Sequence, residues 1–326
     1  MTKQVEEQPE GKKDLLHIVV WGFAFYISST LWMLFGWLSF FFPLIVFVYI
    51  QKFGWKDTNK HLLGALPLAL LAGYFTQSVE LIVFTALFLP SGYVIAYSAH
   101  QSEQPWKAGL KGWLALCGLF FLFFSILSSN SDLSFFQAIT KALETGIDEV
   151  LRQYSQANNL SAENFEILES TLLQAKKTAP LILPAIFGSI FLLVIWTAIV
   201  IGNAFIPRLG CQQPWSAYKH WKLPEKLIWA LILFGLISAF GSGILQKTGI
   251  NVIILIALIY SFQGLAIVVF YLERFNVPKF FRAVIYIMII LQSFGSILLT
   301  VAGVADVWFD LRRVNQIKTN RNSDAE

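Results

Sequence analysis

The chain has 326 residues, of which 56% are hydrophobic and only 13% are charged, with a formal net charge of +4. Soluble domains carry about 25% charged residues, so this composition argues against an ordinary soluble enzyme. It also excludes a disordered chain, which needs low hydrophobicity and high net charge. Nucleic acid is not an expected partner, because lysines and arginines gather in short loops, as they do in membrane proteins.

Long apolar runs identify the class of protein. Residues 15–51, 181–207, 227–246, 248–272 and 283–305 contain no Asp, Glu, Lys or Arg. Each run reaches the roughly 20 residues that cross a hydrocarbon core, whereas an outer-membrane barrel would show alternating segments of about 10 residues. The sequence therefore predicts an all-α, polytopic bundle of eight or nine transmembrane helices, a multi-pass protein of the bacterial cytoplasmic (inner) membrane with the lipid bilayer as its partner.

The predicted membrane helices fall into two groups around a polar insertion. The first apolar run is too long for one crossing and predicts two tightly joined helices that break near 34–37. In chain order, the division is a polar N-terminal tail at 1–14, N-terminal membrane helices at 15–128, an extracytoplasmic helical insertion at 129–179, C-terminal membrane helices at 180–305 and a polar C-terminal tail at 306–326.

The positions of lysine and arginine predict the topology. The basic loops at 52–60, 99–111 and 208–226 are expected on the cytoplasmic side. Segment 129–179 is net acidic and is expected outside. Nine crossings would place the basic C-terminal tail outside and eight would place it inside, and the sequence leaves both counts open.

The insertion is predicted to be a helical hairpin. Phe136, Ile139, Leu143 and Ile147 recur at helical spacing on one stripe. Ser161 has the character of an N-cap for a second amphipathic helix. The apolar stripes must be shielded from water, so the two helices are expected to pack on each other or on the membrane surface.

Polar residues within the apolar helices are the candidates for a functional site. Gln263 and Gln292 lie nearest the middle of the last two predicted spans, and no water reaches polar groups at that depth. They are interpreted either as contacts to a ligand or as interhelical hydrogen bonds. The full set of candidates for a ligand site or polar bundle interior is Gln263, Gln292, Ser296, Thr300, Asp306, Asn251 and Glu80.

Motifs for catalysis are absent from the sequence. It contains no P-loop, no GxGxxG after a strand, no HExxH and no GxSxG. Cys117 and Cys211 are expected at different depths. His61, His100 and His220 fall in predicted cytoplasmic loops and are interpreted mainly as solvated residues. We therefore expect no catalytic residues, no metal site, no cofactor and no enzymatic activity.

Two stripes of small residues are predicted to let helices approach closely. One comprises Ala65, Ala69 and Gly73, and the other comprises Gly235, Ala239 and Gly243.

The C-terminal third resembles a known family. The resemblance is carried by 221–226 (WKLPEK), by 263–266 (QGLA) after Asn251 and Tyr260, and by Gly303, Asp306 and 310–312 (DLR). The N-terminal helix pair, with Pro43 and the turn at 52–54 (KFG), fits the same pattern. Over most of its length outside 129–179, the chain resembles the YybS-like bacterial integral membrane proteins, a domain of unknown function numbered 2232. The resemblance implies a membrane protein and brings no established activity.

Two hypotheses of function follow. The first is a protein that binds or transports a small ligand or lipid within its helix bundle. The alternative is a membrane scaffold that recruits envelope or division proteins, with membrane or cytoplasmic proteins as partners. A polar cavity lined by Gln263 and Gln292 would favour the first, and a fully packed bundle would favour the second.

Overall fold

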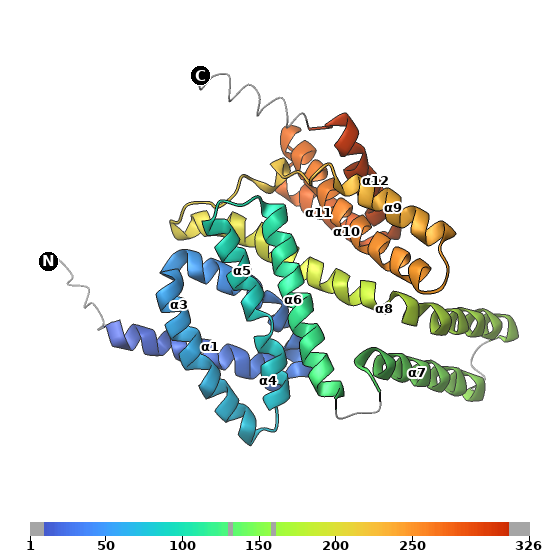
Figure 1. Cartoon of the computed structure of the whole chain (residues 1–326), viewed down its shortest axis with the longest axis horizontal. Helices are drawn as coiled ribbons and strands as arrows, with labels where there is room; N and C mark the ends of the chain where they lie inside the picture. Colours follow the sequence, from blue (N-terminus) through green and yellow to red (C-terminus); the bar gives the residue numbers. More distant parts are fainter. Residues whose placement is uncertain (1–9, 130–132, 158–160, 313–326) are drawn as a thin grey trace. The chain divides into compact units, whose positions relative to one another are not determined.

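The computed structural model describes residues 10–129, 133–157 and 161–312, and every regular element within them is helical (Figure 1). Five segments are long and apolar enough to cross a membrane, or six with the bent pair Lys279–Ile289 and Phe294–Phe309. With the bent pair, the two arms of the broken segment Trp32–Phe75 counted separately and the shorter helix Leu227–Phe240, the described residues contain eight apolar segments, which is roughly consistent with the predicted eight or nine. The predicted all-α membrane fold is confirmed.

The chain forms two compact units, each with its own internal contacts. The N-terminal unit contains Met1–Phe120 and Phe191–Ala217, and the C-terminal unit contains Phe121–Ile190 and Tyr218–Glu326. Both units therefore combine segments that lie far apart in the sequence.

Two breaks shape the N-terminal unit. The predicted break near 34–37 is present as the short helix α2 (Trp32–Phe35) and the 3-10 helix η1 (Gly36–Phe41), between α1 (Glu10–Thr30) and α3 (Phe42–Phe75). The expected loop at 52–60 is instead one residue, Gly54, whose φ of +81° interrupts α3. Glycine tolerates this left-handed φ because it lacks Cβ. The unit continues with α4 (Val79–Ala86), α5 (Leu89–His100) and α6 (Pro105–Ser128).

The first small-residue stripe packs as predicted. Ala65 and Ala69 are buried, and a Cβ on Gly73 would lie 2.2 Å from the side chain of Ile82 in α4. A larger residue at position 73 would therefore require the end of the Ile82 side chain to move.

The C-terminal unit begins with the hairpin. Helix α7 (Phe135–Ala157) and the first part of α8 (Ala162–Phe205) are linked by an ion pair between Asp148 and Lys176, 2.7 Å apart. Ile147, on the predicted apolar stripe of α7, is only 9% exposed. The contact between the two helices agrees with the expectation that they pack on each other.

Helix α8 does not end where a boundary was expected near 180. It runs on through Pro180 and Pro184 into the apolar segment. Asn251 forms hydrogen bonds with the α8 backbone at this point. Its amide donates to Leu181 O and its side-chain oxygen accepts from Ala185 N, both at 2.8 Å. These backbone groups are four residues apart, the spacing of a helical hydrogen bond, so the Asn251 side chain spans one turn of α8 next to Pro184.

The remaining helices are α9 (Leu227–Phe240), α10 (Gly243–Arg274), α11 (Lys279–Leu291) and α12 (Ser293–Phe309). The second small-residue stripe was predicted wrongly, because α9 stops at Phe240 and Gly243 starts the next helix with a φ of +58°. Nothing lies within 4 Å of a Cβ built on Gly235 or Gly243. Close helix approach in this unit occurs elsewhere, at Gly264 and Gly303.

Candidate functional site

Helices α10 and α12 touch backbone to backbone where two glycines meet. A Cβ on Gly264 would lie 2.0 Å from Leu299 O, and a Cβ on Gly303 would lie 2.1 Å from Tyr260 O. These positions admit no side chain unless the helices separate. The contact fixes the neighbouring polar residues, Gln263 on α10 and Asp306 on α12, close to one another.

A buried ion pair lies beside this contact. Arg312 Nη2 donates to Asp306 Oδ2 at 2.8 Å, and both side chains are fully buried. Removing two charges from water is costly, and their attraction offsets that cost only with good geometry and further hydrogen bonds. The surroundings of the pair therefore decide whether it is stable.

Gln263 supplies one of these further hydrogen bonds. Its Nε2 donates to the same Asp306 Oδ2 at 2.9 Å, while its Oε1 accepts from Leu223 N at 3.0 Å. Gln263 thus joins α10, α12 and the connection before α9. This arrangement matches the interpretation of Gln263 as an interhelical bridge.

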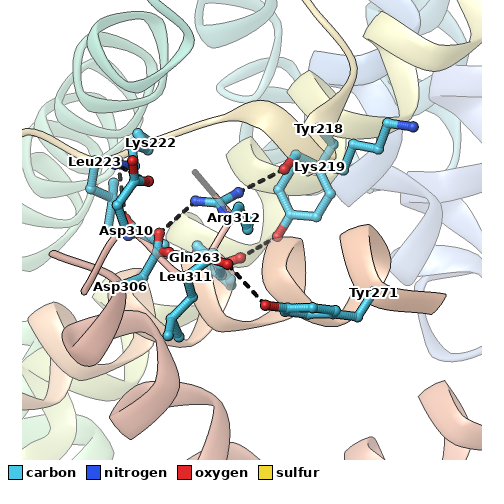
Figure 2. A network of polar contacts seen from close by, with 11 residues as sticks. Tyr218, Lys219, Lys222, Leu223, Gln263, Tyr271, Asp306, Asp310, Leu311 and Arg312 are labelled. Atoms are coloured by element: carbon cyan, nitrogen blue, oxygen red, sulfur yellow. Dashed lines mark hydrogen bonds and ion pairs between the residues drawn. The ribbon is translucent and has the colours of Figure 1, made fainter. Parts of the chain in front are cut away.

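The chain after α12 folds back to bring Arg312 into the pair (Figure 2). Asp310 adopts a φ of +41°, which ends the helix and turns the backbone. Tyr271 Oη then donates to Leu311 O at 2.8 Å, and Arg312 Nη1 donates to Lys219 O at 2.7 Å. We call residues 310–312 the C-terminal hook.

Segment 218–223 makes further hydrogen bonds and ion pairs around the buried Asp306–Arg312 pair. Tyr218 Oη donates to Phe262 O, Lys219 pairs with Glu273 at 2.5 Å, and Lys222 pairs with Asp310 at 2.7 Å. Desolvation, together with the positive charges of Lys219 and Arg312, lowers the pKa of His220 in this segment. A proton on His220 is therefore opposed by its surroundings.

Two atoms of the central pair have no hydrogen-bond partner among the described residues. They are Asp306 Oδ1 and Arg312 Nε, and both are buried. Buried polar atoms are nearly always hydrogen-bonded in native proteins, so each exception needs an explanation. Asp306 Oδ1 is a hydrogen-bond acceptor, and Arg312 Nε carries a hydrogen-bond donor.

The sequence-predicted site residues are only partly brought together. Gln263 and Asp306 meet, and Thr300 Oγ1 donates to Ala257 O at 3.1 Å across the same helix pair. Asn251 belongs to the bridge to α8. Gln292 and Ser296 are exposed, and so is Glu80, which lies in the other unit.

The expectation of a continuous polar face from Gln292 to Thr300 needs correction. The segment predicted as one helix bends by 102° between α11 and α12, and Gln292 lies in the break with extended backbone angles. Helical periodicity cannot place a side chain across such a bend. Gln292 is therefore not in the interior with Gln263.

Arg312 and the segment 218–223 were missed as site residues. Residues 221–226 and 310–312 did stand out as parts of the family resemblance, and the structure brings both to Gln263. No group of three or more His, Cys, Asp or Glu side chains in the described part of the chain is arranged to hold a metal ion.

Comparison with known proteins places the chain in a family. No curated protein and no solved structure matches it. A family model described as predicted membrane protein (DUF2232) matches residues 22–307, which include α10, most of α12 and Asp306. Because this match covers most of the chain, the protein belongs to the DUF2232 family of predicted membrane proteins.

Proposed function

We propose that this membrane protein binds a small zwitterionic group at Asp306 and Arg312, either the polar head of a lipid or a free molecule of the same chemistry. The observation that carries the proposal is the buried pair with one unpartnered acceptor, Asp306 Oδ1, and one unpartnered donor, Arg312 Nε. This is a binding role and requires no catalytic group.

The charges of the site favour a zwitterion. Asp306 and Arg312 neutralise each other, so a ligand with a net charge would leave a buried charge uncompensated. An ammonium group would donate to Asp306 Oδ1, and a phosphate or carboxylate oxygen would accept from Arg312 Nε. Charge-assisted hydrogen bonds of this kind are stronger than neutral ones.

Access to the pair would require movement of the C-terminal hook. Arg312 is buried through its bond to Lys219 O, and the hook is held at its rim by Tyr271 and by the Lys222–Asp310 ion pair. Ion pairs near the surface contribute about 0–1 kcal/mol. Breaking the Lys222–Asp310 ion pair would therefore cost little free energy and would let the C-terminal hook open.

Thermal unfolding of the purified full chain in detergent tests the proposal. Phosphatidylethanolamine has N–H donors, whereas phosphatidylcholine has the same phosphate but no N–H donor. We expect the first lipid alone to raise the Tm, because a ligand at a hundredfold excess over its Kd stabilises the folded state by about 2.7 kcal/mol. Soluble phosphoethanolamine distinguishes a free ligand from a lipid.

Two variants assign the effect to the site. Arg312→Lys keeps the positive charge but lacks Nε, and it should lose the stabilisation. Asp310→Asn is the matched control, because asparagine tolerates the left-handed backbone of residue 310 and only the rim ion pair is removed. Equal effects of the two lipids on the wild-type protein, or a full effect on Arg312→Lys, would contradict the proposal.

The scaffold hypothesis has separate support in α8. It has 44 residues, whereas about 20 suffice to cross a hydrocarbon core of about 30 Å at about 1.5 Å per residue. Ile167 and Leu173, in the hairpin part of α8, are 58% and 42% exposed. Replacing both with aspartate should leave the Tm unchanged and abolish site-specific photo-crosslinking from position 170 if the hairpin recruits a protein.

A further inference from the structure

A chain of three hydrogen-bonded side chains lies in the N-terminal unit. His61 Nδ1 is 2.8 Å from Tyr49 Oη, and His61 Nε2 is 3.0 Å from Asp14 Oδ1. The His61 side chain is 3% exposed and that of Asp14 is 27% exposed. The imidazole is thus enclosed, while the carboxylate still reaches the surface.

The three residues come from both sides of the break at Gly54. Tyr49 lies on the arm of α3 before it, and His61 lies on the arm after it, so their hydrogen bond joins the two arms. Thr58 Oγ1 donates to Gly54 O at 2.7 Å and holds the turn. Asp14, near the start of α1, adds the third element.

The charged and titratable neighbours of His61 are few. His17 stacks on it with ring centroids 4.9 Å apart, and Lys60 pairs with Asp14. Lys52 and Asp57 act at longer range on His17 and Tyr49. Hydrogen bonds from Lys60 and then from His61 lower the pKa of Asp14, which keeps this carboxylate ionised.

We propose that His61 is a proton-binding site, which takes up and releases one proton while it keeps both of its hydrogen bonds. In the neutral form, Nε2–H donates to Asp14 and Nδ1 accepts from the Tyr49 hydroxyl. In the protonated form, Nδ1–H donates to Tyr49 Oη, and the tyrosine proton rotates away. The Asp14 carboxylate balances the imidazolium charge in place, and the added proton comes from water and ends on Nδ1.

This arrangement differs from that of a purely structural histidine. A structural role fixes one tautomer and one direction for each hydrogen bond. Here the tyrosine hydroxyl both donates and accepts, so either protonation state of His61 is satisfied.

Nitrogen NMR of the full chain with ¹⁵N-labelled histidine tests the proposal directly. The sequence has four histidines, so single His→Gln variants assign every signal. We expect the His61 signal to change from the Nε2–H tautomer at high pH to the imidazolium form at low pH in one reversible step. A signal that stays in one form between about pH 4 and pH 9, where free histidine changes completely, would overturn the proposal.

Variants separate the proton site from simple packing. Asp14→Asn removes the balancing charge and should move the His61 transition to lower pH by at least one unit, a tenfold loss of proton affinity. Asp57→Asn, which removes a more distant acid, should move it less. Equal shifts in the two variants, or none in Asp14→Asn, would contradict the proposal. Lys60→Gln should move the transition upward and serves as the second test if Asp14→Asn does not fold.

Discussion

The two units each contain one buried polar cluster, and the clusters are built on opposite principles. In the N-terminal unit, Asp14, His61 and Tyr49 form a chain in which both nitrogens of the histidine have partners. In the C-terminal unit, Asp306 and Arg312 form a buried ion pair, and each has one atom without a partner among the described residues. Both nitrogens of the histidine in the first cluster are hydrogen-bonded, whereas the second cluster keeps one acceptor and one donor without a partner among the described residues.

The difference indicates what each cluster is suited to bind. A titratable group with reversible partners accommodates a proton without structural change. A fixed ion pair with one free acceptor and one free donor is neutral overall, so it suits a ligand with both functions. Buried polar groups that lack partners cost free energy. A ligand would therefore stabilise the C-terminal cluster more than the N-terminal one.

The largest effect is expected at Arg312. Arg312→Met leaves Asp306 buried without its counter-charge, and breaking a buried pair in this way costs about 3–5 kcal/mol. The double variant Asp306→Leu with Arg312→Met removes both charges and should recover much of that loss. Chemical unfolding of the purified variants in one detergent measures both values. A double variant as unstable as the single one would show that the ion pair itself does not determine the loss.

The helix contact that supports the cluster provides the next effect. Gly303→Ala places a methyl group against Tyr260 O, and overpacking of this kind costs about 1–3 kcal/mol or more. Gly235→Ala is the matched control, because space is open around Gly235 and alanine is favoured in helices by about 1 kcal/mol. Equal Tm values for the two variants would show that α10 and α12 do not meet at Gly303.

The contrast between these glycines also shows what the sequence could reveal. The apolar runs predicted the membrane helices, because burial in lipid requires long stretches without charge. The pattern of small residues at every fourth position predicted a contact at Gly73 correctly and one at Gly235 wrongly. Spacing identifies a face only within one continuous helix, and α9 ends before Gly243.

The same limit explains which residues of the candidate site could be predicted from the sequence. Gln263 and Asp306 could be selected because polar residues at the depth of an apolar helix need partners. Arg312 could not, because only the left-handed turn at Asp310 returns it to the helix that it has just left. His61 falls in a predicted solvated loop, because no pattern of residues indicates that one glycine, Gly54, replaces the whole loop at 52–60.

A smaller effect is expected at Tyr49. Tyr49→Phe removes one hydrogen bond to His61 and keeps the ring, so it should cost about 0.5–1.5 kcal/mol. The loss should be well below that of Arg312→Met under the same conditions. Chemical unfolding measures the loss, and a value as large as that of Arg312→Met would contradict the distinction between a reversible cluster and a fixed one.

The smallest effect concerns pH and distinguishes the histidines of the two units. The pKa of His220 is lowered from 6.5, first by desolvation and then by the charges of Lys219 and Arg312. The unfolded chain therefore binds a proton at this residue more readily than the folded one, so stability rises with pH in this range. The contribution of His220 is complete above pH 6.5 and is lost as the pH falls through 6.5 towards the folded-state pKa.

Tm values between pH 8 and pH 5.5 should fall less steeply in His220→Gln than in the wild-type protein, whereas His100→Gln, at an exposed position, should keep the wild-type slope. An unchanged slope in His220→Gln would show that protonation of this histidine is not opposed by its burial or by the charges of Lys219 and Arg312.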